Sequence, residues 1–567
     1  MTNRDDAPTD LILRGGRVFT ANPAQPWADA VAIRGGRIAA VGPEEEIGTF
    51  AGAKSQVFDL PGRLVLPGFQ DSHCHPPAGG LERSQCNLND IHDRQEYLRV
   101  IERYAGANPD VPWIRGGGWY MPVFPGGTPR REDLDAVVPE RPALLTNRDG
   151  HGAWANSRAL QMAGVTADTP DPGDGRIERD PDGSPSGTLH EGAMDLVERV
   201  MPKTTREELA KGLMVAQEYL HSFGITSWQD AIVGSDMWGD TLDVYLDAAR
   251  SGALTARVVG ALWWERTQGE EQVEGLLESR ARGSAGRFKA TSVKIMQDGV
   301  LENGTGGMLE PYLDPCGVEG CGHDRTNRGM SFVDPEALTG YVTRLDREGF
   351  QVHFHAIGDR AVRECLDAVE AAVTANGPND NRHHIAHIQV IHPDDLPRFA
   401  RLGVVANCQP LWAELDAQMV DLTIPFLGPE RSAWQYPFAS LHRSGARLAF
   451  GSDWSVSSPN PLEEIDIAVN RSGPPDTPGA TPDSMETWLP EECLDLATAI
   501  EAFTIGSAFV NHLDDVTGSI EVGKYADMAV VDRDLFDPGV GRISDARVIL
   551  TLAEGETVFL GPEVSGS

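Results

Sequence analysis

The sequence is poor in cysteine and has no long apolar run. Seven cysteines occur among 567 residues, and this sparse, odd number is typical of a reduced cytosol and argues against a disulfide framework. No run of about 18 apolar residues exists, so we expect no transmembrane helix. The first residues, MTNRDDAPTD, lack the basic and apolar regions of a secretory signal. We therefore expect a cytoplasmic protein.

Basic residues are also scarce relative to acidic ones. The chain has 48 Lys and Arg against 85 Asp and Glu, a net charge of −37. A surface this negative repels phosphate groups, which excludes nucleic acids and anionic membranes as partners. The acidity is typical of a soluble protein, or of one from a salty habitat. We expect a small-molecule substrate as partner, and leave open whether the chain forms a homodimer.

The segment PCGVEGCGHD holds Cys316, Cys321 and His323. These residues are suited to a small metal clip or a disulfide, but their spacing is not a standard zinc spacing. An ordinary glycine-rich loop is the simpler interpretation, and the role of the loop stays open.

Both ends of the chain are rich in short apolar runs separated by glycine turns, a pattern typical of β-hairpins. LILRGGRVFT and AVAIRGGRIAAVG near the start resemble in character ARVILTLAEGETVFLG near the end. We predict one small β-sandwich domain built from residues 1–62 and 515–567. Residues 63–514 would be inserted between its two halves.

The middle of the chain alternates short apolar runs with longer amphipathic stretches. Eight strands are predicted, over residues 63–73, 224–230, 256–264, 290–299, 350–359, 382–390, 403–410 and 447–456. Such an alternation favours an α/β fold, a (β/α)₈ TIM barrel. The stretch 76–222 is too long for a single crossover, so it predicts an inserted lobe between the first two strands.

Polar residues cluster at the carboxyl ends of the predicted strands, where chemistry sits in such barrels. They are His73, His75, Lys294, His355, His387 and Asp453. Alone, each histidine is more often a hydrogen-bonded surface group, Lys294 an ion-pair partner, and Asp453 a helix cap. Together they predict a metal site, because imidazole and carboxylate suit zinc and similar ions. His73 and His75 are two apart and so share one face of a strand.

Three further histidines near these strands, His353, His383 and His384, are interpreted as packing or supporting groups. His353 shares the face of His355 but lies one pair deeper in the predicted barrel.

Nearly the whole chain resembles the amidohydrolase superfamily. LVLPGFQDSHCH, VKIMQDG, VHFHAIGDRAV, RHHIAHIQ and FGSDWSV resemble the family's motifs on strands 1, 4, 5, 6 and 8. NRDGHGAWANSRAL and GSIEVGKYADMAVVD resemble a lobe segment and the C-terminal β-domain of the YtcJ-like branch, which includes N-substituted formamide deformylases. Cys74 and Trp454 depart from the family's pattern. Alternation turns the Cys74 thiol away from the site, and Trp454 is expected to narrow the pocket or stack on a substrate.

The resemblance implies two divalent metal ions, most often Zn²⁺, with Mn²⁺ or Fe²⁺ as alternatives. His73, His75 and Asp453 would bind the first ion, and His355 and His387 the second. Lys294 would bridge them as a carbamate, which turns a cation into a bidentate anion. The alternative is an unmodified Lys294 with a single ion.

The implied activity is hydrolysis of a C–N bond in an N-acyl or N-formyl amide, or in a carbamate. A metal-bridged hydroxide would attack, and Asp453 would carry the proton to the leaving nitrogen. His151, Trp154 and Trp454 are predicted to contact the substrate, although lobe aromatics more often build a core.

Three other functions remain open. A lactone, ester or phosphotriester hydrolase would use the same nucleophile. An aromatic-base deaminase is disfavoured, because Gly358 stands where such enzymes tend to have glutamate after His355. A non-catalytic binding protein is disfavoured because all six ligand positions are filled.

Overall fold

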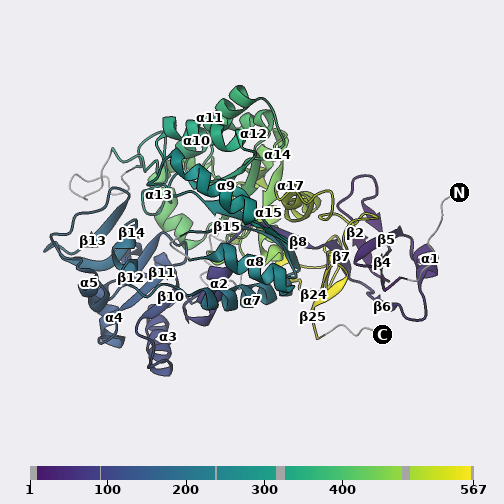
Figure 1. Cartoon of the computed structure of the whole chain (residues 1–567), viewed down its shortest axis with the longest axis horizontal. Helices are drawn as coiled ribbons and strands as arrows, with labels where there is room; N and C mark the ends of the chain where they lie inside the picture. The colour runs from purple at the N-terminus through teal and green to yellow at the C-terminus, as the bar shows by residue number, and fades with distance from the viewer. Residues whose placement is uncertain (1–8, 90, 236–238, 314–325, 475–484, 563–567) are drawn as a thin grey trace.

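The computed structural model describes residues 9–89, 91–235, 239–313, 326–474 and 485–562. Figure 1 shows three parts along the long axis of the molecule: a lobe rich in strands at one end, a central helical body, and a small β-domain that holds both termini. No helix within these ranges is long and apolar enough to cross a membrane. The segment with Cys316, Cys321 and His323, interpreted as a glycine-rich loop with a metal clip or disulfide as the alternative, lies outside the described residues.

Eight parallel strands form the central barrel, which confirms the predicted fold class. In order around the sheet they are β22 (Leu448–Phe450), β21 (Val405–Cys408), β20 (His384–His387), β19 (Gln351–Ala356), β18 (Phe288–Met296), β16 (Arg257–Trp263), β15 (Ile225–Val233) and β8 (Phe69–Cys74). Every strand is paired in parallel with the next one along the chain. All eight carboxyl ends therefore lie at the same mouth.

The two ends of the barrel sheet approach closely through a glycine. The Ser72 hydroxyl donates to the Phe450 carbonyl at 2.7 Å, and the Asp453 N–H donates to the His73 carbonyl at 2.7 Å. A Cβ atom on Gly451 would lie 2.5 Å from the His73 nitrogen. Only glycine lets strand β22 come this near to β8.

Helices cover the outside of the barrel and bury apolar faces against it. They include α7 (Arg206–Ser222), α8 (Thr241–Ser251), α9 (Val273–Arg282), α10 (Pro335–Arg347), α11 (Asp359–Asn376), α12 (Leu396–Leu402), α14 (Phe438–Arg443) and α15 (Pro461–Asn470). Helix α7 begins with a capping box, in which Thr205 and Glu208 satisfy each other's backbone N–H groups. Helix α10 begins at Pro335 after the capping carboxylate of Asp334.

The small β-domain is a sandwich of two sheets that share one core. One sheet has the order β5 (Arg37–Gly42), β4 (Ala30–Arg34), β1 (Leu11–Arg14), β6 (Gln56–Asp59). The other has the order β25 (Glu556–Leu560), β24 (Val548–Ala553), β23 (Met528–Val531), β7 (Leu64–Pro67), β2 (Arg17–Phe19), β3 (Trp27–Ala28). Strands from both ends of the chain thus stand side by side, as predicted.

The single strand predicted over residues 63–73 is two strands, which corrects the sequence interpretation. Strand β7 pairs with β23 and β2 in the sandwich, whereas β8 pairs with β15 in the barrel. Gly68 joins them, with its N–H donating to the Asp527 carbonyl at 2.9 Å. A side chain at Gly68 would collide with Thr226, so the chain can change sheets only where this residue is small.

The inserted lobe contains a six-stranded sheet that lies beside the barrel mouth. Its order is β13 (Gly175–Arg179), β14 (Pro185–Glu191), β12 (Gly152–Ala155), β11 (Ala143–Asn147), β10 (Ile114–Trp119), β9 (Cys86–Asn87). Helices α3 (Arg94–Ala107), α4 (Arg131–Val137) and α5 (Ser157–Ala163) accompany it. Trp119, Phe124 and Trp154 belong to its buried core.

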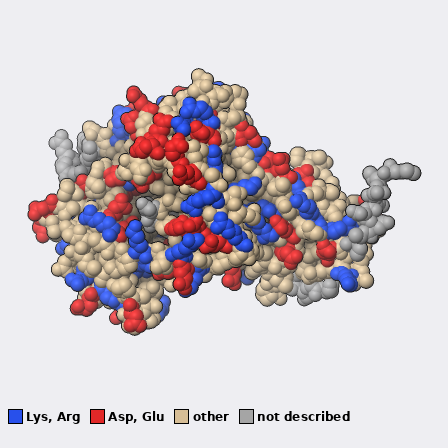
Figure 2. Space-filling view, viewed as in Figure 1, with Lys and Arg blue, Asp and Glu red and all other residues tan. Residues whose placement is uncertain are grey.

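Charged side chains of both signs are mixed over the face of the molecule in view. Figure 2 shows Lys and Arg lying among Asp and Glu, with no continuous basic stripe on this face. The predicted absence of nucleic-acid partners stays a prediction.

Candidate metal centre

The six residues predicted as metal ligands all lie at the barrel mouth and are all buried. Their exposed fractions range from 1% for His73 to 8% for His75. The ligand-bearing segments are the ends of β8, β18, β19, β20 and β22. The parallel sheet places these segments side by side, which is why residues so far apart in the sequence meet.

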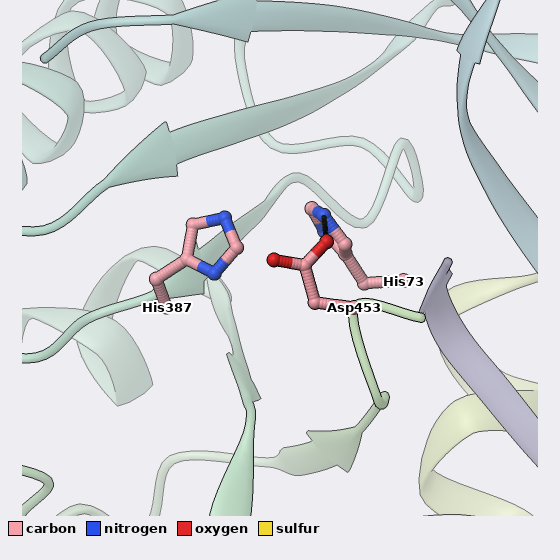
Figure 3. Close-up of side chains that lie close together, drawn as sticks. All are labelled: His73, His387 and Asp453. Carbon is pink, nitrogen blue, oxygen red and sulfur yellow. Dashed lines mark ion pairs between the residues drawn. The ribbon is translucent and has the colours of Figure 1, made fainter. Parts of the chain in front are cut away.

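Three of these residues form a tight group (Figure 3). One ligand atom each from His73, His387 and Asp453 lie within 4.8 Å of one another. The Asp453 Oδ1 atom is 3.2 Å from His73 Nε2 and 2.9 Å from His75 Nε2. Asp453 therefore contacts both histidines of the His-x-His pair and also lies close to the side chain of His387.

Asp453 is ionised despite its burial. Burial raises the pKa of this carboxyl, but the hydrogen bond from His75 and the nearness of His387, His75 and Lys294 outweigh it, so that the net pKa lies below the usual value. The backbone has a φ of 54° here, in the left-handed region that non-glycine residues seldom adopt. The bond from its N–H to His73 holds this conformation.

Lys294 points into the same site from β18. Its Nζ lies 3.4 Å from His73 Nε2, and the residue is 2% exposed. Burial lowers the pKa of this amine to about 7, against the opposing charges of Asp453 and Asp230.

His355 and His387 stand next to each other on adjacent strands. Their ring centroids are 4.5 Å apart. His355 Nδ1 lies 3.3 Å from the Asp298 carboxylate, which itself accepts from the backbone N–H groups of Gly307, Ile357 and Gly358. Asp298 was not singled out from the sequence, although it stands in the VKIMQDG motif.

The donor set fits a divalent transition metal. Burial lowers the pKa of His73, His355 and His387 well below the usual value, with Lys294 and neighbouring histidines adding to the effect, so the imidazoles are neutral. Nδ1 of His387 is buried and has no hydrogen-bond partner within the described part of the chain. Neutral imidazoles around one carboxylate are the ligands that zinc prefers.

The lobe contributes a second charged pair that faces the barrel. Nδ1 of His151 lies 3.0 Å from both carboxylate oxygens of Glu191. His151 directly precedes strand β12 and Glu191 ends the neighbouring strand β14, and the Glu191 N–H also donates to the His151 carbonyl. Thr305, in the segment after β18, donates to Glu191 at 2.9 Å. The ring of His151 lies 5.5 Å from that of His355, so the lobe supplies one wall of the site.

The electrostatics of this pair favour a protonated imidazole. Burial lowers the pKa of His151, but the charge and hydrogen bond of Glu191, with the charges of Asp149 and Asp453, raise it to about 9. Glu191 was missed from the sequence, since nothing in the segment TLHEGA marks it as the partner of a histidine forty residues earlier.

Trp454 and Trp154, both predicted to contact the substrate, lie in different environments. Trp454 lines the cavity and packs against Tyr219, with ring centroids 5.5 Å apart. Trp154 lies in the lobe core, where its indole N–H donates to the Arg130 carbonyl at 2.8 Å and its ring meets Phe124. It is fully buried and does not line the cavity, because that position of β12 faces the lobe's own helices.

A cavity of about 1980 Å³ opens over these residues, between lobe and barrel. Its lining includes the side chains of Val300, Ile357, Leu411, Trp412, Met419 and Tyr436, and the Trp412 ring lies against His387. The lining also includes Glu302, Glu414 and Asp416. The Cys74 thiol turns away from this space towards the Gln229 carbonyl, as alternation predicted.

Comparison with known proteins gives one consistent family. Residues 56–559 match the amidohydrolase family. The protein LONG AFTER FAR-RED 3 of Arabidopsis thaliana is 33% identical over 557 residues, which is 97% of this chain and 91% of that protein. The N-substituted formamide deformylase of Arthrobacter pascens is 27% identical over 558 residues, 96% of this chain and 97% of the deformylase.

A solved structure has the same architecture. It is that of an uncharacterized metal-dependent hydrolase from Pyrococcus furiosus, with a TM-score of 0.68 and 26% identity, covering 92% of this chain and 99% of that one.

Proposed function

Because this chain belongs to the amidohydrolase family, we propose that it is a metal-dependent hydrolase of a C–N bond in an N-acyl or N-formyl amide, or in a carbamate. The observation that carries the proposal is the convergence of four neutral histidines, one lysine and one ionised aspartate at the barrel mouth. The similarity of the whole chain to a formamide deformylase supports the choice of bond.

Two divalent ions, most often Zn²⁺, would be held at this mouth. His73, His75 and Asp453 would hold one, and His355 and His387 the other. We propose that Lys294 bridges them as a carbamate, formed when its neutral amine adds carbon dioxide and releases a proton. Its burial beside His73, with no carboxylate of the described residues in hydrogen-bond contact, supports this role. When bound, such ions lower the pKa of a water molecule and polarise a carbonyl group.

Asp453 would carry the proton during turnover. The water oxygen forms a bond to the acyl carbon, and its proton passes to Asp453. The carboxyl then gives that proton to the nitrogen as the C–N bond breaks, so the product leaves as an amine. Amide hydrolysis needs this second transfer because an amine anion is a very poor leaving group. The bond from the Asp453 N–H to the His73 carbonyl keeps this residue in place between these steps.

His151 would bind the substrate carbonyl from the lobe side. Glu191 holds the ring by Nδ1, which leaves Nε2 as the nitrogen available to a ligand. A fixed imidazolium donor close to the acyl oxygen stabilises the negative charge that develops there. Trp454 would border the same space, whereas Trp154 has no place in the proposal.

The residues of the cavity wall indicate which substituent the substrate has. The surface beside His387, including Trp412 and Tyr436, is suited to an aromatic or other bulky apolar group. The acyl carbon would sit over the metal ligands with that group against the wall.

One experiment tests the proposal directly. Metal content per chain would be measured by elemental analysis on native protein, followed by assays with N-acyl amide, lactone, ester and phosphotriester substrates. About two metals and release of amine from an N-acyl substrate are expected. If only the lactone, ester or phosphotriester substrates are hydrolysed, the proposed metal site would still hold, but the assignment to a C–N bond would be wrong. Protein without bound metal would overturn the whole proposal.

A further inference from the structure

A further buried histidine, His353, lies directly behind the metal centre. His353 is one residue pair deeper than His355 on β19, level with Lys294 on β18 and with His384 on β20. His353 and His384 are completely buried. His353 Nε2 lies 2.7 Å from Nδ1 of His73, with the two rings at 73° to each other. Among the described residues, His353 alone bonds to that nitrogen of His73.

The two ring nitrogens of His73 therefore face different partners. Nε2 faces the site, 3.2 Å from Asp453 and 3.4 Å from Lys294 Nζ. Nδ1 faces away from the site, towards His353. A neutral imidazole has one N–H and one bare nitrogen. For Nε2 to bind a metal it must be bare, so Nδ1 must carry the hydrogen and donate it to His353 Nε2.

The neighbouring groups are arranged to leave His353 free for this bond. The Asn407 amide is oriented by the Ser72 carbonyl, which accepts from its Nδ2, and by the Gln409 side-chain amide, which donates to its Oδ1. The same Nδ2 lies 3.1 Å from His384 Nδ1, which must then be the acceptor. His384 is thus held by Asn407, and it meets His353 only by ring packing, with centroids 4.0 Å apart.

We propose that His353 is a positioning residue, whose Nε2 accepts the Nδ1–H of His73 and so fixes His73 as a metal ligand through Nε2. This inference rests on the metal-dependent function proposed above. Partners of this kind fix the tautomer and the ring orientation of a metal-binding histidine, and their loss commonly weakens metal binding 10–100-fold. The usual partner is a carboxylate or a carbonyl; here an imidazole takes that role, and it adds no negative charge next to Lys294.

Two substitutions at His353 separate the bond from the packing. His353→Phe keeps a ring but removes the acceptor. His353→Gln keeps an amide oxygen near the place of Nε2. His384→Phe is the matched control, since it removes a buried imidazole from the same barrel interior without touching the bond to His73. Metal-free samples of each variant would first be compared with wild type by circular dichroism and thermal unfolding.

The readout is the dissociation constant for Zn²⁺, measured by competition with a chromophoric chelator, together with the visible spectrum of the Co²⁺-loaded protein. We expect His353→Phe to bind about 10–100-fold more weakly, and His353→Gln and His384→Phe to stay within a few-fold of wild type. A folded His353→Phe variant with wild-type affinity would overturn the inference, as would a Gln variant as weak as the Phe variant.

The outcome is separable from that of the proposed function. If wild type binds metal but cleaves no N-acyl substrate, the proposed function fails while the affinity series still decides the role of His353. If wild type binds no metal, both fail together.

Discussion

The indole of Trp412 lies nearly parallel to the imidazole of His387, with ring centroids 5.3 Å apart and an angle of 11° between the planes. The indole N–H donates to the Ser457 hydroxyl at 3.1 Å, which keeps the ring from turning. One face of His387 is therefore covered by an aromatic ring that also forms part of the cavity wall. The same residue can support a ligand and contact a substrate.

Trp412→Ala is expected to lower kcat/KM for N-acyl substrates with an aromatic group by about 2–10-fold more than for small aliphatic ones. The reason is that an aromatic pair contributes about 0.5–1.5 kcal/mol beyond simple burial. Steady-state kinetics on a matched pair of substrates measures the ratio. Trp412→Phe, which keeps a ring, should show most of the wild-type preference. Equal losses on both substrates would argue against a substrate contact.

Lys294→Ala should reduce the metal content from about two ions per chain to one or none. The lysine is the only proposed ligand common to both ions. Elemental analysis gives the count, and intact mass under conditions that preserve a carbamate tests the modification. Lys289→Ala, an exposed lysine on the same strand, is the control. An unchanged metal count in the Lys294 variant would contradict the bridging role.

Asp453→Asn should lower kcat by about 10²–10⁴-fold, the range that a positioned acid–base group contributes. Asparagine keeps the shape and one ligand oxygen but cannot carry a proton between water and nitrogen. Metal content must be measured on the same sample, so that loss of the ion is not mistaken for loss of proton transfer. A fully loaded variant with wild-type turnover would remove Asp453 from the mechanism.

Glu191→Gln and His151→Gln should each lower kcat/KM by about 10–100-fold, since a hydrogen bond to a charged group is worth about 1.5–3 kcal/mol. If Glu191 acts by holding His151, the double variant should be no worse than either single one. Additive losses would show that the two residues act separately. Unfolding midpoints of all three variants serve as the check that the lobe remains folded.

A pH effect on stability is expected away from the active site, at Asp346. This carboxylate accepts from His383 Nε2 at 2.9 Å and from the amides of Asn376, Asn379 and Asn381. Burial raises its pKa, but these bonds outweigh burial and hold the folded-state pKa below the ordinary 3.8. A depressed carboxyl pKa stabilises the fold above the ordinary value, and this contribution is lost as the pH falls below about 4.

Asp346→Asn is therefore expected to destabilise the protein by about 2 kcal/mol near pH 7 and to flatten the loss of stability below pH 4. Urea unfolding at several pH values measures both effects. Asp367→Asn removes an exposed carboxylate paired with Arg398, and should change little because surface ion pairs contribute about 0–1 kcal/mol. If the free energy of unfolding of the Asp346 variant is lower than wild type by the same amount at every pH, the substitution has removed packing contacts and not a charge interaction.

The barrel strands could be predicted because each one carries a local signal. Histidine, lysine or aspartate directly after a short apolar run, as at His355 and Asp453, marks a buried strand that ends at a polar mouth. The resemblance to the amidohydrolase family, predicted from these motifs, is confirmed. The identity of the ligands and the domain boundaries stay predictions.

Other features have no local signal. The run RLVLPGF is uniformly apolar, so the change of sheet at Gly68 is visible only when Asp527 and Thr226 stand beside it. Glu191 meets His151 because two lobe strands pair, and His353 meets His73 across the barrel. Trp154 was predicted to contact the substrate as an aromatic residue of the lobe, but it packs in the lobe core.

The switch between β7 and β8 has a consequence for the order in which the protein can form on the ribosome. Strand β7 stands between β2 and β23, so the sheet it belongs to stays open until residues 528–531 have been synthesised. During that time the strand leading into His73 has an unpaired edge, the kind of surface that recruits other chains. Production of this protein should therefore be sensitive to how quickly β23 leaves the ribosome.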